Sequence, residues 1–318
     1  MPQKIIIDTD PGVDDAMAIL FALKAPELEL VGLTTIYGNV HTDLATQNAL
    51  RLLEVAGRPD IPVAHGANLP LVLPFDHPAA QVHGADGFGN TNQPPPHGKP
   101  IDPSAAQFIV ETVMAHPGQV TLVPIGPLTN LALALALEPR LVGAVAGVVL
   151  MGGAALVNGN VTPAAEANIY KDPHAADVVF TAGWPLTMVG LDVTTKTVMT
   201  PDDIAGLKSA GTKATDFIEA ISHFYMAYYR QAFHGLHGMH LHDPSAVAYV
   251  IDPSLFTTLP TPIRVITDGI AAGLTFADRR QQWEIPNGWT DQPPTNICID
   301  VDSPRLLNLY RTYMTRPD

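Results

Sequence analysis

The stretch Lys4-Ile-Ile-Ile-Asp-Thr-Asp-Pro-Gly-Val-Asp-Asp-Ala-Met-Ala-Ile19 decides the fold of this chain. Its three consecutive isoleucines, residues 5–7, predict a buried strand. Pro11 and Gly12 then force a sharp turn, and residues 16–24 are typical of a helix. The stretch therefore predicts one strand–turn–helix unit with a crowded acidic junction between its two elements.

Four carboxylates mark that junction, namely Asp8, Asp10, Asp14 and Asp15. Packed this closely, they repel one another and lose hydration. A cation with several oxygen ligands relieves both costs, and ligands that are all oxygens suit a hard ion such as Ca²⁺ or Mg²⁺. An ordinary acidic helix N-terminus explains Asp14 or Asp15 equally well, but it does not explain Asp8 and Asp10. We therefore favour a metal site.

Composition limits the classes of partner. The 318 residues carry a formal net charge of −14, which argues against nucleic acid or an anionic membrane surface as the main partner. The first residues lead directly into a strand without a signal peptide, and no apolar run is long enough to span a bilayer. The single cysteine, Cys298, suits a small buried position and a reducing compartment, so we expect a cytoplasmic protein.

Strands and helices alternate along the rest of the chain. We expect strands at 28–35, 61–64, 120–125, 145–151, 186–189, 263–267, 273–276 and 296–301, and helices at 42–56, 104–115, 172–182, 243–251 and 303–315, with others ending at 137 and spanning most of 201–233. This order predicts an α/β fold, an open and mostly parallel sheet flanked by helices, in a single domain over residues 1–318. Ser303 is the expected N-cap of the last helix, with Pro304 at its first position.

Two segments stand apart from this pattern. Residues 66–103 lack periodicity and are rich in Gly, Pro, Asn and His, so we expect a functional loop such as a lid. Residues 215–242 are expected to be a helical, His-rich part of the active site. Polar residues also follow several strands directly, and ligands of such sheets bind beyond the carboxyl ends of the strands. The unusual polar residues should therefore gather at one edge of the sheet.

A second polar cluster contains Asn158, Asn160, Glu166 and Asn168. Its amides and carboxylate can hydrogen-bond several sugar hydroxyls, although Asn and Gly are also ordinary turn residues. Both interpretations stay open on the sequence.

A third cluster contains the histidines His234, His237, His240 and His242, followed by Asp243 and Pro244. Four histidines suggest zinc, but no cysteine is near and the spacing fits neither a helix nor a zinc finger. Asp243 is also an ordinary N-cap type. A histidine of near-neutral pKa beside a metal-binding aspartate is a candidate general acid.

With these clusters the chain resembles the inosine-uridine nucleoside hydrolase family. The matching motifs run in family order across residues 4–244: Asp8-Thr-Asp10-Pro-Gly-Val-Asp14-Asp15, Thr35-Ile-Tyr-Gly-Asn39, His83-Gly-Ala-Asp-Gly, Gly126-Pro-Leu-Thr-Asn130, Met151-Gly-Gly, Gly159-Asn160 through Glu166-Ala-Asn168, and His242-Asp243-Pro244. The resemblance implies a Rossmann-like nucleoside hydrolase fold. It also implies an enzyme of nucleoside salvage that uses Ca²⁺ to cleave the N-glycosidic bond of ribonucleosides.

The resemblance also carries over site roles. It places metal ligation on Asp10, Asp15, Asp243 and the carbonyl of Ile125, with Asp10 as the general base. It places ribose binding on Asp14, Asn39, Met151, Asn160, Glu166 and Asn168. His242 would help the base depart, and His83 and His240 would do so for pyrimidines. Tyr225, Tyr228 and Tyr229 are candidates for stacking on the nucleobase, with an aromatic core face as the alternative.

Two residues depart from the family pattern. Ala167 stands where the family commonly has Phe, which removes an aromatic wall near the sugar. Ile125 replaces a Thr found in some members, a harmless change if only the carbonyl is used. The histidines favour pyrimidine or broad specificity, and the family is usually a homodimer or homotetramer.

Two other functions remain open on the sequence. One is a phosphoryl-transfer enzyme that uses Asp8-Thr-Asp10 as an aspartyl-phosphate motif. The other is a non-catalytic nucleoside-binding protein.

Overall fold

A computed structural model describes residues 2–75, 77–280, 287–289 and 291–317. Within them the chain forms a nine-stranded sheet in the order β10-β9-β11-β6-β5-β4-β1-β2-β3, and a separate pair, β7 with β8. The strands are β1 (Gln3–Thr9), β2 (Leu28–Thr35), β3 (Val63–Ala64), β4 (Val120–Pro124), β5 (Gly147–Met151), β6 (Leu186–Val189), β7 (Val198–Met199), β8 (Met239–His240), β9 (Phe256–Val265), β10 (Thr275–Ala277) and β11 (Pro294–Val301).

The helices connect these strands. They are α1 (Val13–Lys24), α2 (Thr42–Val55), α3 (Ala80–His83), α4 (Ala105–Ala115), α5 (Thr129–Leu137), α6 (Leu141–Ala144), α7 (Ala167–Lys171), α8 (Pro173–Thr181), α9 (Leu191–Thr194), α10 (Pro201–Lys208), α11 (Lys213–Ala232), α12 (His242–Ile251) and α13 (Ser303–Met314), with two short 3₁₀ turns, η1 (Pro253–Leu255) and η2 (Gly269–Ala271).

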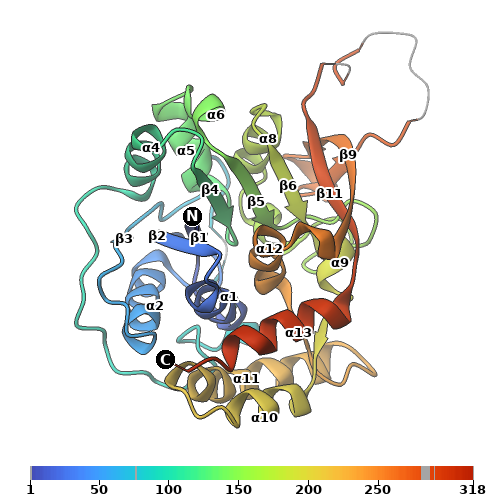
Figure 1. The fold of residues 1–318 in the computed structure, drawn as a ribbon. Helices are drawn as coiled ribbons and strands as arrows, with labels where there is room; N and C mark the ends of the chain where they lie inside the picture. The colour runs from blue at the N-terminus through green and yellow to red at the C-terminus, as the bar shows by residue number, and fades with distance from the viewer. Residues whose placement is uncertain (1, 76, 281–286, 290, 318) are drawn as a thin grey trace.

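The isoleucine run of β1 lies at the centre of the sheet, between β2 and β4, and pairs with both in parallel. Successive side chains of a strand point to opposite faces. Ile5 and Ile7 therefore join the apolar core on the side of α1, α2, α11, α12 and α13. Ile6 joins the core on the side of α4, α5, α6 and α8. Figure 1 shows these two layers of helices on either side of the sheet. The expected α/β fold is confirmed.

The parallel part of the sheet has an antiparallel extension. β6 pairs with β11 in parallel, whereas β11 pairs with β9 and β9 with β10 in antiparallel fashion. β9 is longer than expected, because it spans Phe256–Val265 although it contains Pro260 and Pro262. β10 pairs only with residues 263–265, so among the described residues no strand pairs with Pro260 and Pro262 on the side of β9 away from β11, where prolines are tolerated.

Several boundaries correct the sequence expectations. Asp302, not Ser303, is the N-cap of α13, because its side chain accepts the Arg305 N–H. Asp243 lies inside the first turn of α12, whose N-cap is Leu241, so it is not a capping residue there. The short helices α6, α7 and α9 were not anticipated. Cys298 is fully buried in β11, as expected.

The long segment 66–103 packs against the carboxyl edge of the sheet; its residue 76 lies outside the described residues. It contains the short helix α3, and the Ala79 N–H donates to the carbonyl of Asn39 at 3.0 Å. Ile101 forms a parallel bridge with Ala64. In the part of the chain that the structure describes, no helix is long and apolar enough to cross a membrane.

Candidate active site

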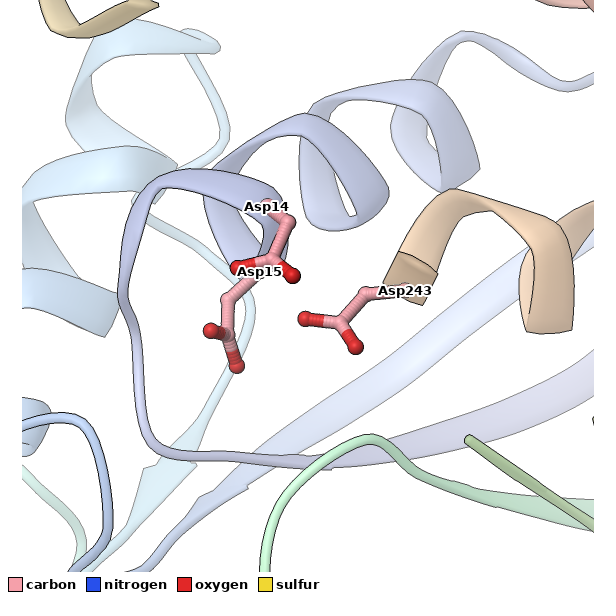
Figure 2. Close-up of side chains that lie close together, drawn as sticks. All are labelled: Asp14, Asp15 and Asp243. Carbon is pink, nitrogen blue, oxygen red and sulfur yellow. The ribbon is translucent and has the colours of Figure 1, made fainter. Parts of the chain in front are cut away.

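Three carboxylates meet at the carboxyl edge of the sheet. Asp14 and Asp15 lie in the first turn of α1, and Asp243 lies in the first turn of α12. Each offers an oxygen within 4.8 Å of the others, and all three side chains are buried. Figure 2 shows them directed toward one another from the two helix ends. A group of this kind can hold a metal ion.

Burial and mutual repulsion make this cluster costly without a cation. Burial, followed by the negative charges of Asp14, Asp15 and Asp10, raises the pKa of Asp243 well above its usual range. Burial raises the pKa of Asp14 to about 6. Burial and the charge of Asp14 also raise the pKa of Asp15. Such shifts arise when carboxylates share a dry site, and a cation reverses them.

Asp10 lies beside this group at the end of β1. Its Oδ2 accepts the Asn39 N–H at 2.6 Å, while its buried Oδ1 has no hydrogen-bond partner among the described residues. Gly38 and Gly126 approach the carboxylate so closely that a Cβ at either glycine would collide with it. Burial and the charge of Asp15 raise the pKa of Asp10 well above its usual range. The backbone thus holds Asp10 and leaves one oxygen free.

Asp15 is the most firmly oriented of the acids. Its Oδ1 accepts the Thr9 hydroxyl at 2.6 Å and the Asp10 N–H at 3.3 Å. Its Oδ2 accepts the Gly12 N–H and the Asn39 amide, both at 2.9 Å. These donors keep the carboxylate in one position at the start of α1. The site thus offers buried carboxylate oxygens that are held by hydrogen bonds, as in Asp15, and others without a partner among the described residues, as in Asp10. Such a set of oxygens fits a hard cation such as Ca²⁺.

The carboxyl ends of β4 and β5 complete one wall of the site. The Asn168 amide donates to the carbonyls of Ile125 at 2.9 Å and Met151 at 3.1 Å. The structure therefore brings Ile125, Met151 and Asn168 together, as the sequence predicted. The side-chain amide of Asn168 bridges the ends of β4 and β5.

Glu166 and Asn160 belong to the segment that returns to this wall. Glu166 is buried and is the N-cap of α7, accepting the N–H groups of Asn168 and Ile169. Its Oε2 also accepts the Gly153 N–H at 2.9 Å. Asn160 is exposed, and its side chain accepts the Ala167 N–H at 3.0 Å. Both residues therefore stabilise the loop itself, as the turn interpretation of this cluster predicted, while its sugar-binding role stays a prediction.

A chain of hydrogen bonds joins the acids to His242. The Tyr225 hydroxyl donates to Asp14 Oδ2 at 3.1 Å and lies 3.4 Å from the Tyr229 hydroxyl. The Tyr229 hydroxyl lies 2.8 Å from His242 Nε2, and His242 Nδ1 lies 2.7 Å from the Thr194 hydroxyl. Both tyrosines lie on α11 with their rings buried in the core, as in the alternative interpretation, while their hydroxyls reach Asp14 and His242.

His83 and His240 border the same cluster. His83 Nδ1 accepts the Val13 N–H at 3.2 Å, and its ring stacks on Tyr225 with centroids 5.2 Å apart. The His240 ring packs edge-on against Tyr229 at 5.2 Å. His234 and His237 are exposed and lie outside this group.

The expectation of a near-neutral histidine pKa is wrong for these buried rings. Burial lowers the pKa of His242 to about 3 and that of His83 and His240 to about 4. The imidazole rings are therefore neutral near neutral pH. His242 can donate a hydrogen bond, but in this state it does not carry a positive charge.

The sequence analysis placed Asp8 among the acids of the metal junction, but the structure does not bring it into the group of Asp14, Asp15 and Asp243. Its Oδ1 instead accepts the Thr34 hydroxyl at 2.6 Å and the Asn130 amide at 2.8 Å. Sequence reasoning missed two supporting residues. Thr194 and Asp192 lie on α9, directly after β6. The rule that ligands bind beyond strand carboxyl ends applies to β6 as well, and it would have pointed to both.

Comparison with known proteins agrees with this geometry. The sequence profile of the family described as inosine-uridine preferring nucleoside hydrolase matches residues 5–308. The probable uridine nucleosidase 2 of Arabidopsis thaliana is 48% identical over 309 residues, covering 96% of each chain. The inosine-uridine preferring nucleoside hydrolase of Leishmania major is 44% identical over 283 residues, covering 88% of this chain and 89% of that protein.

Solved structures give the same assignment. A plant nucleoside hydrolase enzyme superimposes with a TM-score of 0.97 at 45% identity, covering 100% of both chains. The family profile, the relatives and the solved structure agree on one family and one fold for this chain. The chain therefore belongs to the inosine-uridine preferring nucleoside hydrolase family and is a hydrolase of N-glycosyl bonds in ribonucleosides.

Proposed function

We propose that this protein is a Ca²⁺-dependent ribonucleoside hydrolase of pyrimidine or broad specificity, producing ribose and the free base. The observation that carries the proposal is the buried group of Asp14, Asp15 and Asp243 beside the unpartnered oxygen of Asp10. Among the described residues no lysine or arginine pairs with these four buried acids, and the nearby His83 is neutral, so the acids call for a bound cation.

The residues that would hold the ion are Asp10, Asp15 and Asp243 with the Ile125 carbonyl. Asp14 has an oxygen within 4.8 Å of oxygens of both Asp15 and Asp243, so it would border both the ion and the sugar. When bound, Ca²⁺ would polarise a water molecule and the ribose hydroxyls. Asp10 Oδ1 is the unpartnered oxygen that would take the proton from the attacking water, as a general base.

The remaining acids act on the sugar. Cleavage of the ribosyl C–N bond builds positive, oxocarbenium-like charge on the ribose. Asp14 and Glu166 are buried negative groups fixed before the reaction starts, and preorganised charges of this kind stabilise such a transition state. Asn39, Asn160, Asn168 and Met151 would orient the hydroxyls and the ring.

The leaving base requires a proton or a hydrogen bond. Because His242 is neutral, we propose that it acts as a hydrogen-bond donor within the chain Tyr225–Tyr229–His242 rather than as an imidazolium acid. His83 and His240, on either side of this chain, would contact a pyrimidine. Relatives named uridine nucleosidase and inosine-uridine preferring nucleoside hydrolase support this range of bases.

We further propose a cytoplasmic homodimer or homotetramer, with residues 66–103 as a lid over the site. The single buried cysteine supports the reducing compartment. The contact between Ala79 and Asn39 supports the lid, because it fixes this segment to the residue that orients Asp10 and Asp15.

The test is release of free ribose from uridine, cytidine, inosine and adenosine in parallel, with Ca²⁺ and with a strong chelator. We expect release from at least uridine and its loss with the chelator, restored by added Ca²⁺. Release that the chelator leaves unchanged would contradict the metal dependence. Release from purine nucleosides alone would contradict the proposed specificity.

A further inference from the structure

Four consecutive backbone amides just after β5 are each bound by a buried side-chain oxygen. The Gly153 N–H donates to Glu166 at 2.9 Å and the Ala154 N–H to the Thr275 hydroxyl at 2.9 Å. The next two, of Ala155 and Leu156, donate to the two oxygens of Asp192 at 3.0 and 2.7 Å. The backbone amides of a surface loop are usually bound by water. Four buried side-chain acceptors in a row therefore indicate that the protein holds this part of the loop in one position.

The acceptors come from distant parts of the chain. Asp192 lies on α9 after β6, and Thr275 begins β10 in the antiparallel extension; both are buried. The Leu191 N–H also donates to the Gly153 carbonyl at 2.9 Å. The start of the segment 153–168 is thus fixed to α9 and β10, which in the described part of the chain form no hydrogen bond with a candidate metal ligand.

The end of the same segment rests on the same extension. At Gly273, which has a φ of +85°, an added Cβ would lie 2.8 Å from the Ala165 Cβ and 2.9 Å from the Tyr170 Cα. The turn before β10 therefore approaches the backbone of α7 without any side chain between them. Thr275 and Gly273 support opposite ends of one loop.

The segment has little apolar packing of its own in its middle. Leu156, Val157 and Val161 are 42%, 45% and 49% exposed, so burial of these side chains does not hold the loop. Its position must come from the polar contacts at its ends. It carries Asn160, Glu166 and Asn168, which the proposed function assigns to ribose binding.

We infer that Asp192 and Thr275 are positioning residues for substrate, holding the segment 153–168 so that its amides and carboxylate meet the ribose. The inference rests on the proposed function, because it assumes that this segment binds the sugar. It gives the antiparallel extension of the sheet a role in substrate affinity, although that extension contributes none of the proposed ligands of the ion.

The primary test compares two matched variants, Thr275→Val and Thr295→Val. Both threonines are buried in the antiparallel part of the sheet, but the Thr295 hydroxyl has no hydrogen-bond partner among the described residues. We expect Thr275→Val to raise KM for the ribonucleoside about tenfold, since one buried amide loses its acceptor. kcat should fall less than KM rises, because Asp10 and the acidic cluster are untouched. Thr295→Val should leave both constants unchanged.

A second pair tests the carboxylate. Asp192→Asn keeps the size of the side chain but presents an NH₂ group to one of the two amides, so KM should rise at least as much. Asp177→Asn is its control, since the Asp177 carboxylate accepts the Val265 N–H and binds Arg264, and among the described residues it forms no hydrogen bond with the segment 153–168. This control should lower the melting temperature without raising KM.

Hydrogen exchange of the amides 153–156 separates the inference from the proposed function. We expect faster exchange there in Thr275→Val than in Thr295→Val. If these amides exchange faster in Thr275→Val but KM is unchanged, the positioning role is overturned. If their exchange in Thr275→Val is unchanged, Thr275 does not hold the segment in place. Failure of the proposed function would appear in the unaltered protein, as absence of ribose release, before any variant is compared.

Discussion

Asp10 is held by backbone atoms on several sides. The Asn39 N–H binds one oxygen, and the α-carbons of Gly38 and Gly126 lie too close to the carboxylate to accept a side chain. This arrangement fixes the acid without consuming its second oxygen. At the scale of single residues, the free oxygen is what distinguishes Asp10 from Asp15, which accepts four hydrogen bonds.

Asp10→Asn should abolish most of the activity while preserving the fold. The amide oxygen can still accept the Asn39 N–H, but the side chain can no longer accept a proton, and loss of a general base typically lowers kcat about 10²- to 10⁴-fold. Steady-state ribose release measures this. Asp8→Asn is the matched control on the same strand and should retain most of the activity. An Asp10→Asn enzyme within tenfold of the original would refute the assignment.

His240→Gln should change how stability depends on pH. Burial lowers the pKa of His240 from 6.5 to about 4, so on acidification the unfolded chain binds a proton before the folded protein does. The folded protein therefore loses stability as pH falls from about 6.5 toward about 4. The variant has no histidine at this position and therefore does not lose stability in this way. Near pH 5 its free energy of unfolding should rise by at most about 2 kcal/mol relative to the original protein, compared with the difference near neutral pH.

Denaturant unfolding at several pH values measures that gain in stability. The control substitution is His234→Gln, at an exposed histidine in the turn between α11 and β8. A difference between His240→Gln and the original protein that stays constant from about pH 7.5 to about pH 5 would contradict the predicted titration.

Single residues also show what the sequence alone can and cannot supply. The motif positions located Asp10, Asp15, Asn39 and Asp243 correctly at one edge, because spacing along β1 and α1 is local. The pKa of His242 could not be anticipated, because it depends on burial by Tyr229 and Thr194 from other elements. Asp8 is buried and bonded to Thr34 and Asn130, so it is not an accessible phosphoryl acceptor.

At the scale of elements, the N-termini of α1 and α12 meet and present three acids to one another. The helix dipoles favour negative charge at these ends, which partly offsets the repulsion. The strands β2 and β6 have the bounds expected from their apolar runs, because such runs are local signals. The bounds of β9 depend on pairing with β11 far along the chain, and no local signal reports that pairing.

Asp243→Asn should separate metal binding from folding. Removing one of the three charges should raise the melting temperature of the chelated protein, because the repulsion decreases. At a Ca²⁺ concentration of about a hundred times Kd, bound Ca²⁺ should raise the free energy of unfolding of the unaltered protein by about 2.7 kcal/mol. In the variant most of this stabilisation should be missing. Thermal unfolding with Ca²⁺ and with chelator measures both effects.

The control for this experiment is Asp252→Asn, at the other end of α12, where the acid pairs with Arg305. It should keep the full gain from Ca²⁺. An Asp243→Asn protein that is stabilised by Ca²⁺ as strongly as the unaltered protein would mean that the ion binds elsewhere.

At the scale of the whole molecule, the two ends of the chain pack together. Tyr310 of α13 is fully buried against Phe21 of α1, with ring centroids 4.9 Å apart. The last helix thus covers the helix that begins with Asp14 and Asp15, as Figure 1 shows. The alternation of strands and helices predicted this layered architecture, but it could not predict which helix covers α1.

Tyr310→Ala should therefore destabilise the protein by about 3–5 kcal/mol, as other large buried aromatic side chains do when truncated. Activity at low temperature should remain, because Tyr310 packs against Phe21 and its hydroxyl donates to the Met17 carbonyl, and neither residue belongs to the candidate site. Denaturant unfolding measures the loss. Leu137→Ala, a truncation on α5 at a side chain that is 60% exposed, should cost much less.

The buried position of Cys298 has a practical consequence for spectroscopy. It is the only thiol in the chain, and burial raises its pKa to about 12, so maleimide and iodoacetamide reagents find no thiolate to attack. A cysteine introduced at the exposed Val157 would then be the sole target for a fluorophore or spin label. Because the native thiol does not react, movement of the segment 153–168 can be followed through a label at position 157 without altering any other native residue.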